Sequence, residues 1–309
     1  MTNPKESFST PEVWLRILVQ ALLVIGLAVA LLKITLAYSD KTLTLHHPEF
    51  LLPTFFLQGL VIALAATLWR RSLAIVSPLA LERRQALAHV GIILVAKYVP
   101  GKLWGLVGRG LHARHLGITA GAITTATALE QLAIMSSAIM IMGAGLFHEH
   151  LPWLVPALAA TILILCSTWK KSFDLLAKWA KGPLVRLLIL IEQGSAHLCS
   201  KAFAGLCWLA FWQWILTSIL LAEIVAATGA TFSIDLVFAL IIAAPAAIIA
   251  GFLVIFVPGG IGIREGVLVY YLEPVIGMEA AIMTAIVFRI VETLRDVVMG
   301  IWAAKMIRT

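Results

Sequence analysis

Long, nearly unbroken apolar runs dominate the chain, and each approaches or exceeds the ~20 residues that a helix needs to cross a bilayer core. The first run, 15–38, is longer than the apolar core of a secretory signal, and no small-residue cleavage site follows Tyr38. We therefore interpret it as a span rather than a signal. The pattern predicts an all-α polytopic membrane protein with about six full spans, at residues 15–38, 50–69, 119–147, 151–169, 203–227 and 278–304.

Two further apolar stretches, 86–99 and 234–257, run into Pro-Gly breaks and continue as short amphipathic segments. At Pro100 and Pro258 the proline ends the incoming helix, and the glycines that follow permit a reversal. We therefore predict two re-entrant helical hairpins, each of which enters and leaves the membrane on one side. The second stretch is long enough to cross outright, but Pro245 inside it favours a break and the re-entrant interpretation.

Basic residues alternate between the loops that these spans define. The segment 70–84 holds four arginines and the connection 170–202 holds six lysines or arginines, whereas 148–150 and 228–233 hold none. Because lysine and arginine mark cytoplasmic loops, both chain termini are predicted in the cytoplasm. The same rule accounts for the net charge of +7 without nucleic acid as a partner. The connection 170–202 is interpreted as a basic amphipathic helix on the cytoplasmic leaflet.

Composition excludes several classes of function. The 309 residues are 61% hydrophobic and only 13% charged, which a soluble domain does not carry. The three cysteines have no paired spacing and are interpreted as packing residues. The pair His112 and His115 and the triplet His148-Glu149-His150 have spacings that suit a metal, but no third ligand set accompanies them, so we interpret them as surface histidines. We predict no enzyme, no metal and no cofactor.

The two Pro-Gly breaks also match each other in sequence. Tyr98-Val99-Pro100-Gly101 corresponds to Phe256-Val257-Pro258-Gly259, and downstream Gly117 aligns with Gly277 and Thr124 with Thr284. We predict one transmembrane domain, 1–309, made of an inverted repeat with halves at 14–147 and 151–307, as in many secondary transporters. The alternative is chance similarity between helices rich in small residues.

This repeat directs two helix starts at the membrane interior from opposite faces, and opposed N-termini favour an anion. A charge near the bilayer centre costs at least ~2.5 to 3.5 kcal/mol on insertion scales, so cations there imply a water-filled cavity or a negative partner such as phosphate. The competing interpretation, for Lys97 and Arg109 above all, is that the side chains snorkel to the interface. The candidate substrate-binding residues are Lys97, Pro100, Gly101, Lys102, Arg109, Pro258, Gly259, Gly260, Arg264 and Glu265.

Polar residues inside two predicted spans form a second group, expected to face the protein interior. One interpretation is a structural ion pair, with Arg289 joined either to Glu292 or to Glu130. The other is a proton relay or a role in substrate binding. The group comprises Glu130, Gln131, Arg289, Glu292 and Asp296.

The segments KYVPGKLW at 97–104, with Arg109, and PGGIGIREG at 258–266 resemble the flippase-like family related to the transmembrane region of lysylphosphatidylglycerol synthases. The resemblance covers nearly the whole chain. It implies a module of the cell (inner) membrane that moves a lipid between leaflets. Some members carry a soluble synthase domain; this sequence ends at Thr309, directly after the last predicted span, so we expect no lysyl transfer.

The function that follows is a lipid flippase for a phospholipid or a lipid-linked glycan precursor. The expected ligand is an anionic phospholipid or a polyprenyl-phosphate-type lipid. Two alternatives stay open: a secondary transporter of a small anionic metabolite, and a non-catalytic membrane partner of a lipid or glycan synthase or of a glycosyltransferase.

Overall fold

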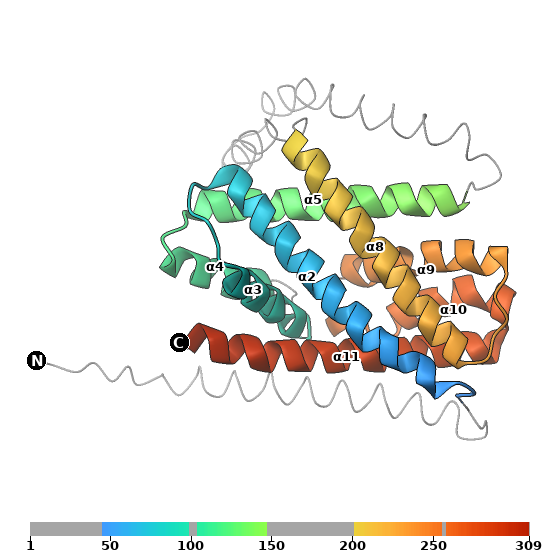
Figure 1. Ribbon diagram of the computed structural model, residues 1–309. Coiled ribbons are helices and arrows are strands. Elements are labelled where there is room, and N and C mark those ends of the chain that lie inside the picture. The colour runs from blue at the N-terminus through green and yellow to red at the C-terminus, as the bar shows by residue number, and fades with distance from the viewer. Residues whose placement is uncertain (1–44, 99–103, 147–200, 255–257, 309) are drawn as a thin grey trace, which may run out of the picture.

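The computed structural model describes residues 45–98, 104–146, 201–254 and 258–308, and within these ranges it is all helical, as predicted (Figure 1). The predicted spans 15–38 and 151–169 and the connection 170–202 lie outside the described residues. The elements are η1 (Pro48–Phe50), α2 (Leu51–Val76), α3 (Arg83–Ala96), α4 (Trp104–His115), α5 (Ala120–Leu146), α8 (Lys201–Ala227), α9 (Ile234–Leu253), η3 (Pro258–Gly260), α10 (Ile263–Ile276) and α11 (Met278–Arg308).

Four of these helices are long and apolar enough to cross a membrane: α2 together with η1, α5, α8 and α9. Three of them coincide with predicted spans. Large apolar side chains such as Phe56, Leu52 and Val298 also point outward, 71%, 75% and 64% exposed, where a bilayer would cover them. These features describe a helical membrane protein.

The break expected at Pro245 is wrong, because α9 continues through this proline to Leu253. Pro245 is buried, and its neighbours Ala243, Ala244 and Ala247 are fully or almost fully inaccessible. Packing around the helix thus keeps α9 continuous, although Pro245 has no N–H to donate to the preceding turn. At 20 residues, α9 has the length of a full span.

Both Pro-Gly stretches join helices that pack against each other: α3 against α4, and α9 against α10. Each pair is followed by a glycine with positive φ and then by a long helix. Gly117 (φ 85°) precedes α5, and Gly277 (φ 81°) precedes α11. These are the two glycines that the sequence alignment placed at equivalent positions, and only glycine adopts such backbone angles readily.

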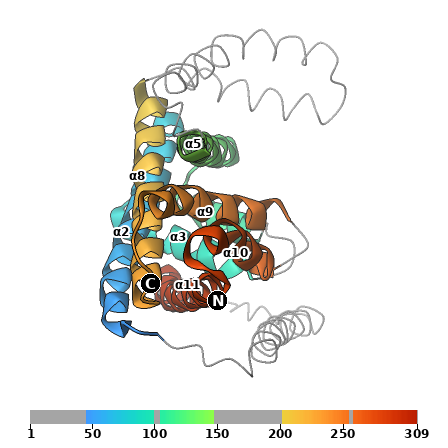
Figure 2. The ribbon, with the colours of Figure 1, turned by 90° about the vertical axis from the view of Figure 1, so that its right-hand side faces the viewer.

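The helix contacts fall into corresponding pairs. Within each predicted half, α2 contacts α3 as α8 contacts α9, and α2 contacts α5 as α8 contacts α11. Across the halves, α3 packs on α11 and α9 packs on α5. The helices α2 and α8, which the predicted repeat makes equivalent, run side by side, and α5 and α11 lie near opposite ends of this pair (Figures 1 and 2).

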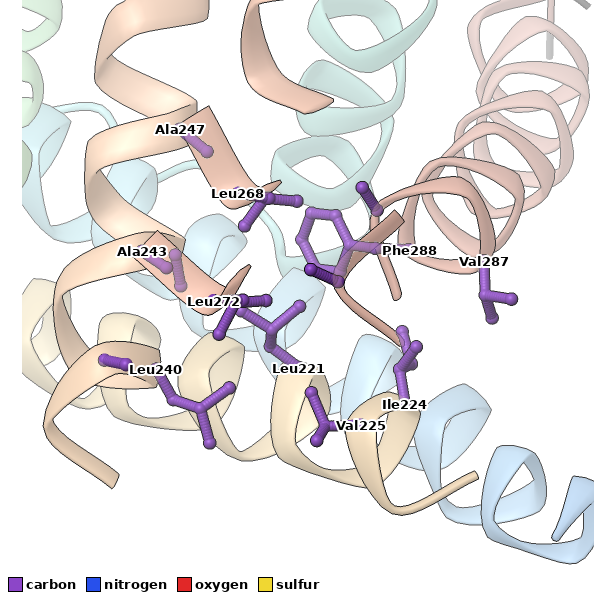
Figure 3. Close-up of a cluster of buried hydrophobic side chains, with 14 of the residues drawn as sticks. Leu221, Ile224, Val225, Leu240, Ala243, Ala247, Leu268, Leu272, Val287 and Phe288 are labelled. Atoms are coloured by element: carbon purple, nitrogen blue, oxygen red, sulfur yellow. The ribbon is translucent and has the colours of Figure 1, made fainter. Parts of the chain in front are cut away.

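The largest apolar core lies where α8, α9, α10 and α11 converge (Figure 3). Leucines 221, 240, 268 and 272 and Phe288 fill it, each at most 4% exposed. A second core joins α2, α3 and the start of α5 around Trp69 and Leu73. These two cores fix the α3–α4 and α9–α10 hairpins against the long helices, so that the ends of the hairpins meet.

Candidate functional site

The two hairpins touch at their Pro-Gly ends. The backbone N–H of Gly259 in η3 donates a hydrogen bond of 2.8 Å to the carbonyl of Lys97, just after α3. Gly259 and Gly260 both have positive φ, 61° and 68°. A Cβ on Gly259 would lie 2.9 Å from Nη2 of Arg289 and 3.2 Å from the ring of Tyr98, so the close approach requires glycine.

Charged side chains surround this contact, and we call them the junction cluster. Lys97, Arg264, Arg289 and Arg295 supply four cations, and Glu265, Glu292 and Asp296 supply three carboxylates. The cluster draws on the end of α3, the start of α10 and the middle of α11. It therefore combines residues from both predicted halves.

Asp296 is the most heavily bonded carboxylate of the junction cluster. It is fully buried, and its Oδ2 lies 2.6 Å from Nζ of Lys97 and accepts a hydrogen bond of 2.7 Å from the hydroxyl of Tyr98. Its Oδ1 accepts bonds from Nε and Nη2 of Arg295, at 3.0 and 2.9 Å. Arg295 also donates from Nη1 to Oε1 of Gln58, at 2.7 Å, which ties the cluster to α2.

The other two carboxylates hold the arginines near the η3 turn. Glu292 accepts hydrogen bonds from Nη1 of Arg264 and from Nη2 of Arg295, each of 3.1 Å. Glu265 lies 3.4 Å from Nε of Arg289, while its Oε2 accepts from the backbone N–H of Gly262 at 2.6 Å. The start of α10 is thus already capped by a carboxylate of its own first turn.

The junction cluster retains positive charge and unused donors. Its four cations face three carboxylates, so among the described residues one positive charge is uncompensated. Nε of Arg264 and Nη2 of Arg289 are buried, and neither has a hydrogen-bond partner among the described residues. Buried donors are normally paired, so these guanidinium groups retain donors for an acceptor oxygen, with the charge-assisted bonding that arginine offers to phosphate.

The structure brings together most of the second polar group, but not in the predicted pairs. Both expected partners of Arg289 are wrong: Glu292 binds Arg264 and Arg295, and Glu130 binds Arg109. The η3 turn folds over α11 and presents the Gly259 carbonyl, 3.0 Å from Nη1 of Arg289. Arg289 therefore bonds to the η3 backbone and to Glu265. Glu292 lies one helical turn further along α11.

Arg109 forms a separate buried group. It is fully buried, so the snorkelling interpretation is wrong for it. Its Nη1 lies 2.8 Å from Oε2 of Glu130, its Nη2 donates to Thr127 at 2.9 Å, and its guanidinium stacks 3.7 Å from the ring centre of Trp69. None of these contacts joins it to the junction cluster. Gln131, the neighbour of Glu130, is half-buried.

Lys97 also does not snorkel, because its side chain is only 17% exposed and bonded to Asp296. Of the other candidate substrate-binding residues, the structure brings Gly259, Gly260, Arg264 and Glu265 to the same contact between the hairpins as Lys97. Pro258 lies in the η3 turn. Pro100, Gly101 and Lys102 lie outside the described residues.

Sequence reasoning missed Tyr98, Gln58 and Arg295. Tyr98 stands beside Lys97 in the first Pro-Gly segment, and Arg295 is three residues from Glu292 and adjacent to Asp296. Gln58 is an isolated amide in an apolar run. An intramembrane polar residue of this kind is itself a signal, since it needs a partner inside the protein.

His112 is not a surface histidine as expected. It is half-buried in the last turn of α4, a helix outside the four apolar spans, and its Nδ1 lies 2.8 Å from Nε2 of the fully buried His89. Partial burial lowers the pKa of His112 from its ordinary value, and His115 lowers it further. Among the described residues no group of His, Cys, Asp and Glu could hold a metal. Cys207 is a free, half-buried thiol near Ser136, as expected for a packing residue.

Comparison of the chain with known protein families and with curated proteins finds no match.

Proposed function

We propose that this chain is an integral membrane translocase that moves a phosphate-bearing lipid, a phospholipid or a lipid-linked glycan precursor, between leaflets. The observation that carries the proposal is the junction cluster: excess positive charge and two unpartnered guanidinium donors, buried where two hairpins meet. An intramembrane ionisable group is costly and is usually kept for function. A phosphate oxygen provides what this cluster lacks, a negative charge and hydrogen-bond acceptors.

The lipid, rather than a small anion, is favoured by the resemblance of the two Pro-Gly segments to the flippase-like family. In this proposal the protein lies in the cell (inner) membrane, with six full spans, two re-entrant hairpins and both termini in the cytoplasm. The length of α9 also allows it to cross outright, which would change the side on which α10 ends. No catalytic chemistry is needed for translocation, so the protein is proposed not to be an enzyme.

The corresponding helix contacts of the two halves support the inverted repeat. In such proteins one half rocks against the other around a site near the membrane midplane. Contacts that join the halves would then change during transport, and these include the bonds of Lys97 and Tyr98 to Asp296. The phosphate would bind Arg264 and Arg289 in place of part of their carboxylate partners, with Lys102 as a further ligand.

The test is mass spectrometry of lipids that co-purify in mild detergent, followed by leaflet-exchange assays in liposomes made with the enriched lipid. The Lys102→Gln, Arg264→Gln double variant is compared with wild type. Arg84→Gln, which removes an exposed cation at the start of α3, is the matched control. Wild type and control should enrich one phosphate-bearing lipid and exchange it, whereas the double variant should lose both properties.

Unchanged leaflet exchange in a folded double variant would contradict this site. Bulk lipid in all three samples, together with uptake of a small anion, would instead favour the metabolite transporter. Bulk lipid with no uptake and a co-purifying synthase or glycosyltransferase would favour the non-transporting partner.

A further inference from the structure

A chain of hydrogen bonds outside the junction cluster links α2, α3 and α4. Nε1 of Trp69 donates to Nδ1 of His89 at 3.0 Å, and Nε2 of His89 lies 2.8 Å from Nδ1 of His112. The rings of His89 and His112 meet edge to face, with centroids 5.0 Å apart. The two histidines therefore join the two helices of the first hairpin.

Trp69 determines where the protons lie along this series of hydrogen bonds. An indole N–H can only donate, so Nδ1 of His89 accepts and the proton of the neutral ring sits on Nε2. That proton can be used only if Nδ1 of His112 accepts it, so His112 carries its own proton on Nε2. Both histidines are neutral in this arrangement, each in one defined tautomer.

The surroundings determine which histidine titrates. His89 is fully buried, and the Arg109 guanidinium stacks on the same Trp69 ring. A second positive charge on His89 is therefore opposed by burial and by Arg109, whose own charge is balanced by Glu130 of α5. His112 is only half-buried, so it is the member that can take a proton from water.

Among the described residues, the other groups around the pair do not offer His112 an anion. His115, exposed one turn further along α4, is another base. α11 meets α3 beside Gly91 through Met299 and Ala303, and α2 contributes Trp69. The pair therefore titrates in a basic and apolar setting, where added positive charge is unfavourable.

We propose that His89 and His112 form a pH-sensitive tie between α3 and α4, which opens when His112 binds a proton. Protonation places an N–H on Nδ1 of His112, opposite the N–H on Nε2 of His89. Two donors then face each other, and the hydrogen bond is lost. Neither rotation of the His89 ring nor a shift of its proton to Nδ1 restores this bond without breaking the bond from Trp69.

The position of the tie determines what its opening does. His89 lies at the middle of α3 and His112 in the last turn of α4, away from the Pro-Gly end of the hairpin. At the Pro-Gly end, Gly105 of α4 packs closely on Ile93 of α3. Opening therefore releases the C-terminal turn of α4 while the end that bears Lys97 stays packed. The tie does not depend on the proposed function.

Hydrogen–deuterium exchange of the full chain in detergent tests the tie, at about pH 7.5 and about pH 4; the acid value is set well below an ordinary histidine pKa because burial and His115 lower the pKa of His112. His112→Asn keeps an acceptor oxygen near the Nδ1 position but cannot titrate. His115→Asn, which alters the exposed histidine one turn on, is the matched control. After correction for intrinsic rates, acid should raise exchange at the end of α4 about tenfold in wild type and control, the effect of losing one hydrogen bond. His112→Asn should show no rise.

Equal responses in all three proteins, or no response in wild type, would overturn the proposal. Nitrogen NMR of the histidine rings in wild type gives a second measurement, should His112→Asn fail to fold. Near neutral pH both Nδ1 atoms should lack a proton, and in acid His112 should gain one while His89 stays neutral. A proton on Nδ1 of His89 at neutral pH would also overturn it.

Discussion

Lys97 and Asp296 form a buried salt bridge of 2.6 Å that joins the end of α3 to the middle of α11. The two residues lie in different predicted halves of the chain. Because Asp296 also accepts from Tyr98 and Arg295, this carboxylate is the point at which three donors from two elements converge.

Asp296→Asn should destabilise the protein strongly. The substitution leaves the ammonium of Lys97 and the guanidinium of Arg295 without their shared negative charge, and breaking a buried ion pair typically costs about 3 to 5 kcal/mol. Combining it with Lys97→Met should recover part of the loss. Unfolding of both variants in detergent, followed by tryptophan fluorescence, measures this. A single variant as stable as wild type would show that the pair is not needed for stability.

Arg109→Gln should also destabilise the protein, through a different pair. It leaves the buried carboxylate of Glu130 without its charged partner and removes the guanidinium from the Trp69 ring. The double variant Arg109→Met, Glu130→Gln should melt closer to wild type, because no unpaired charge remains. If Arg109 instead served the substrate, the single variant would melt like wild type and retain less lipid.

Gly259→Ala should weaken lipid retention as well as stability. Its backbone has φ 61°, where an alanine costs about 1 to 2 kcal/mol, and the added methyl group would push against Arg289 and Tyr98. Gly266→Ala, inside α10, is the control, because no described neighbouring residue lies within 4 Å of the position that a methyl group would take there. Co-purified lipid and melting temperature are measured together. Equal behaviour of the two variants would contradict the close approach of the hairpins.

Gly91→Ala should cost more stability than Gly145→Ala. A methyl group on Gly91 would lie 2.6 Å from the backbone oxygen of Met299, at the contact of α3 with α11. On Gly145 it would meet the side chain of Ile242 at 2.6 Å, where α5 contacts α9, and a side chain can move aside more easily than backbone. Melting temperatures of both variants give the comparison. The reverse order would mean that the α3–α11 contact is looser than its distances indicate.

The sequence predicted the spans that are fixed by hydrophobic length. Residues 50–69, 119–147 and 203–227 became α2, α5 and α8, because only a helix satisfies its own backbone in lipid. The end of the second span differs, because the prediction places it at residue 69, before the two arginines. α2 continues past Arg70 and Arg71 to Val76, since charged residues do not end a helix unless water or packing favours another conformation there.

The choice of ion-pair partners could not be predicted in the same way. Spacing along α11 indicates which residues share a face, but Arg289 is bonded by the η3 turn, whose position depends on how α9 and α10 pack. Arg109 and Glu130 were both found as candidates, yet their pairing requires that α4 lie beside α5. The break predicted at Pro245 is wrong for a related reason: the packing around α9 outweighs the tendency of proline to end a helix.

The hydrogen bond from Gly259 to Lys97 makes separation of the two hairpin ends unfavourable in itself. Under the proposed function the contact lies within the membrane, so parting the two ends would leave a backbone donor and a backbone acceptor without partners where water is scarce, at a cost of several kcal/mol per group. A phosphate oxygen beside Gly259 could take up the freed N–H. Under the proposed function, cargo would then lower the barrier to opening, and an empty protein would resist it, which limits leakage of ions across the membrane.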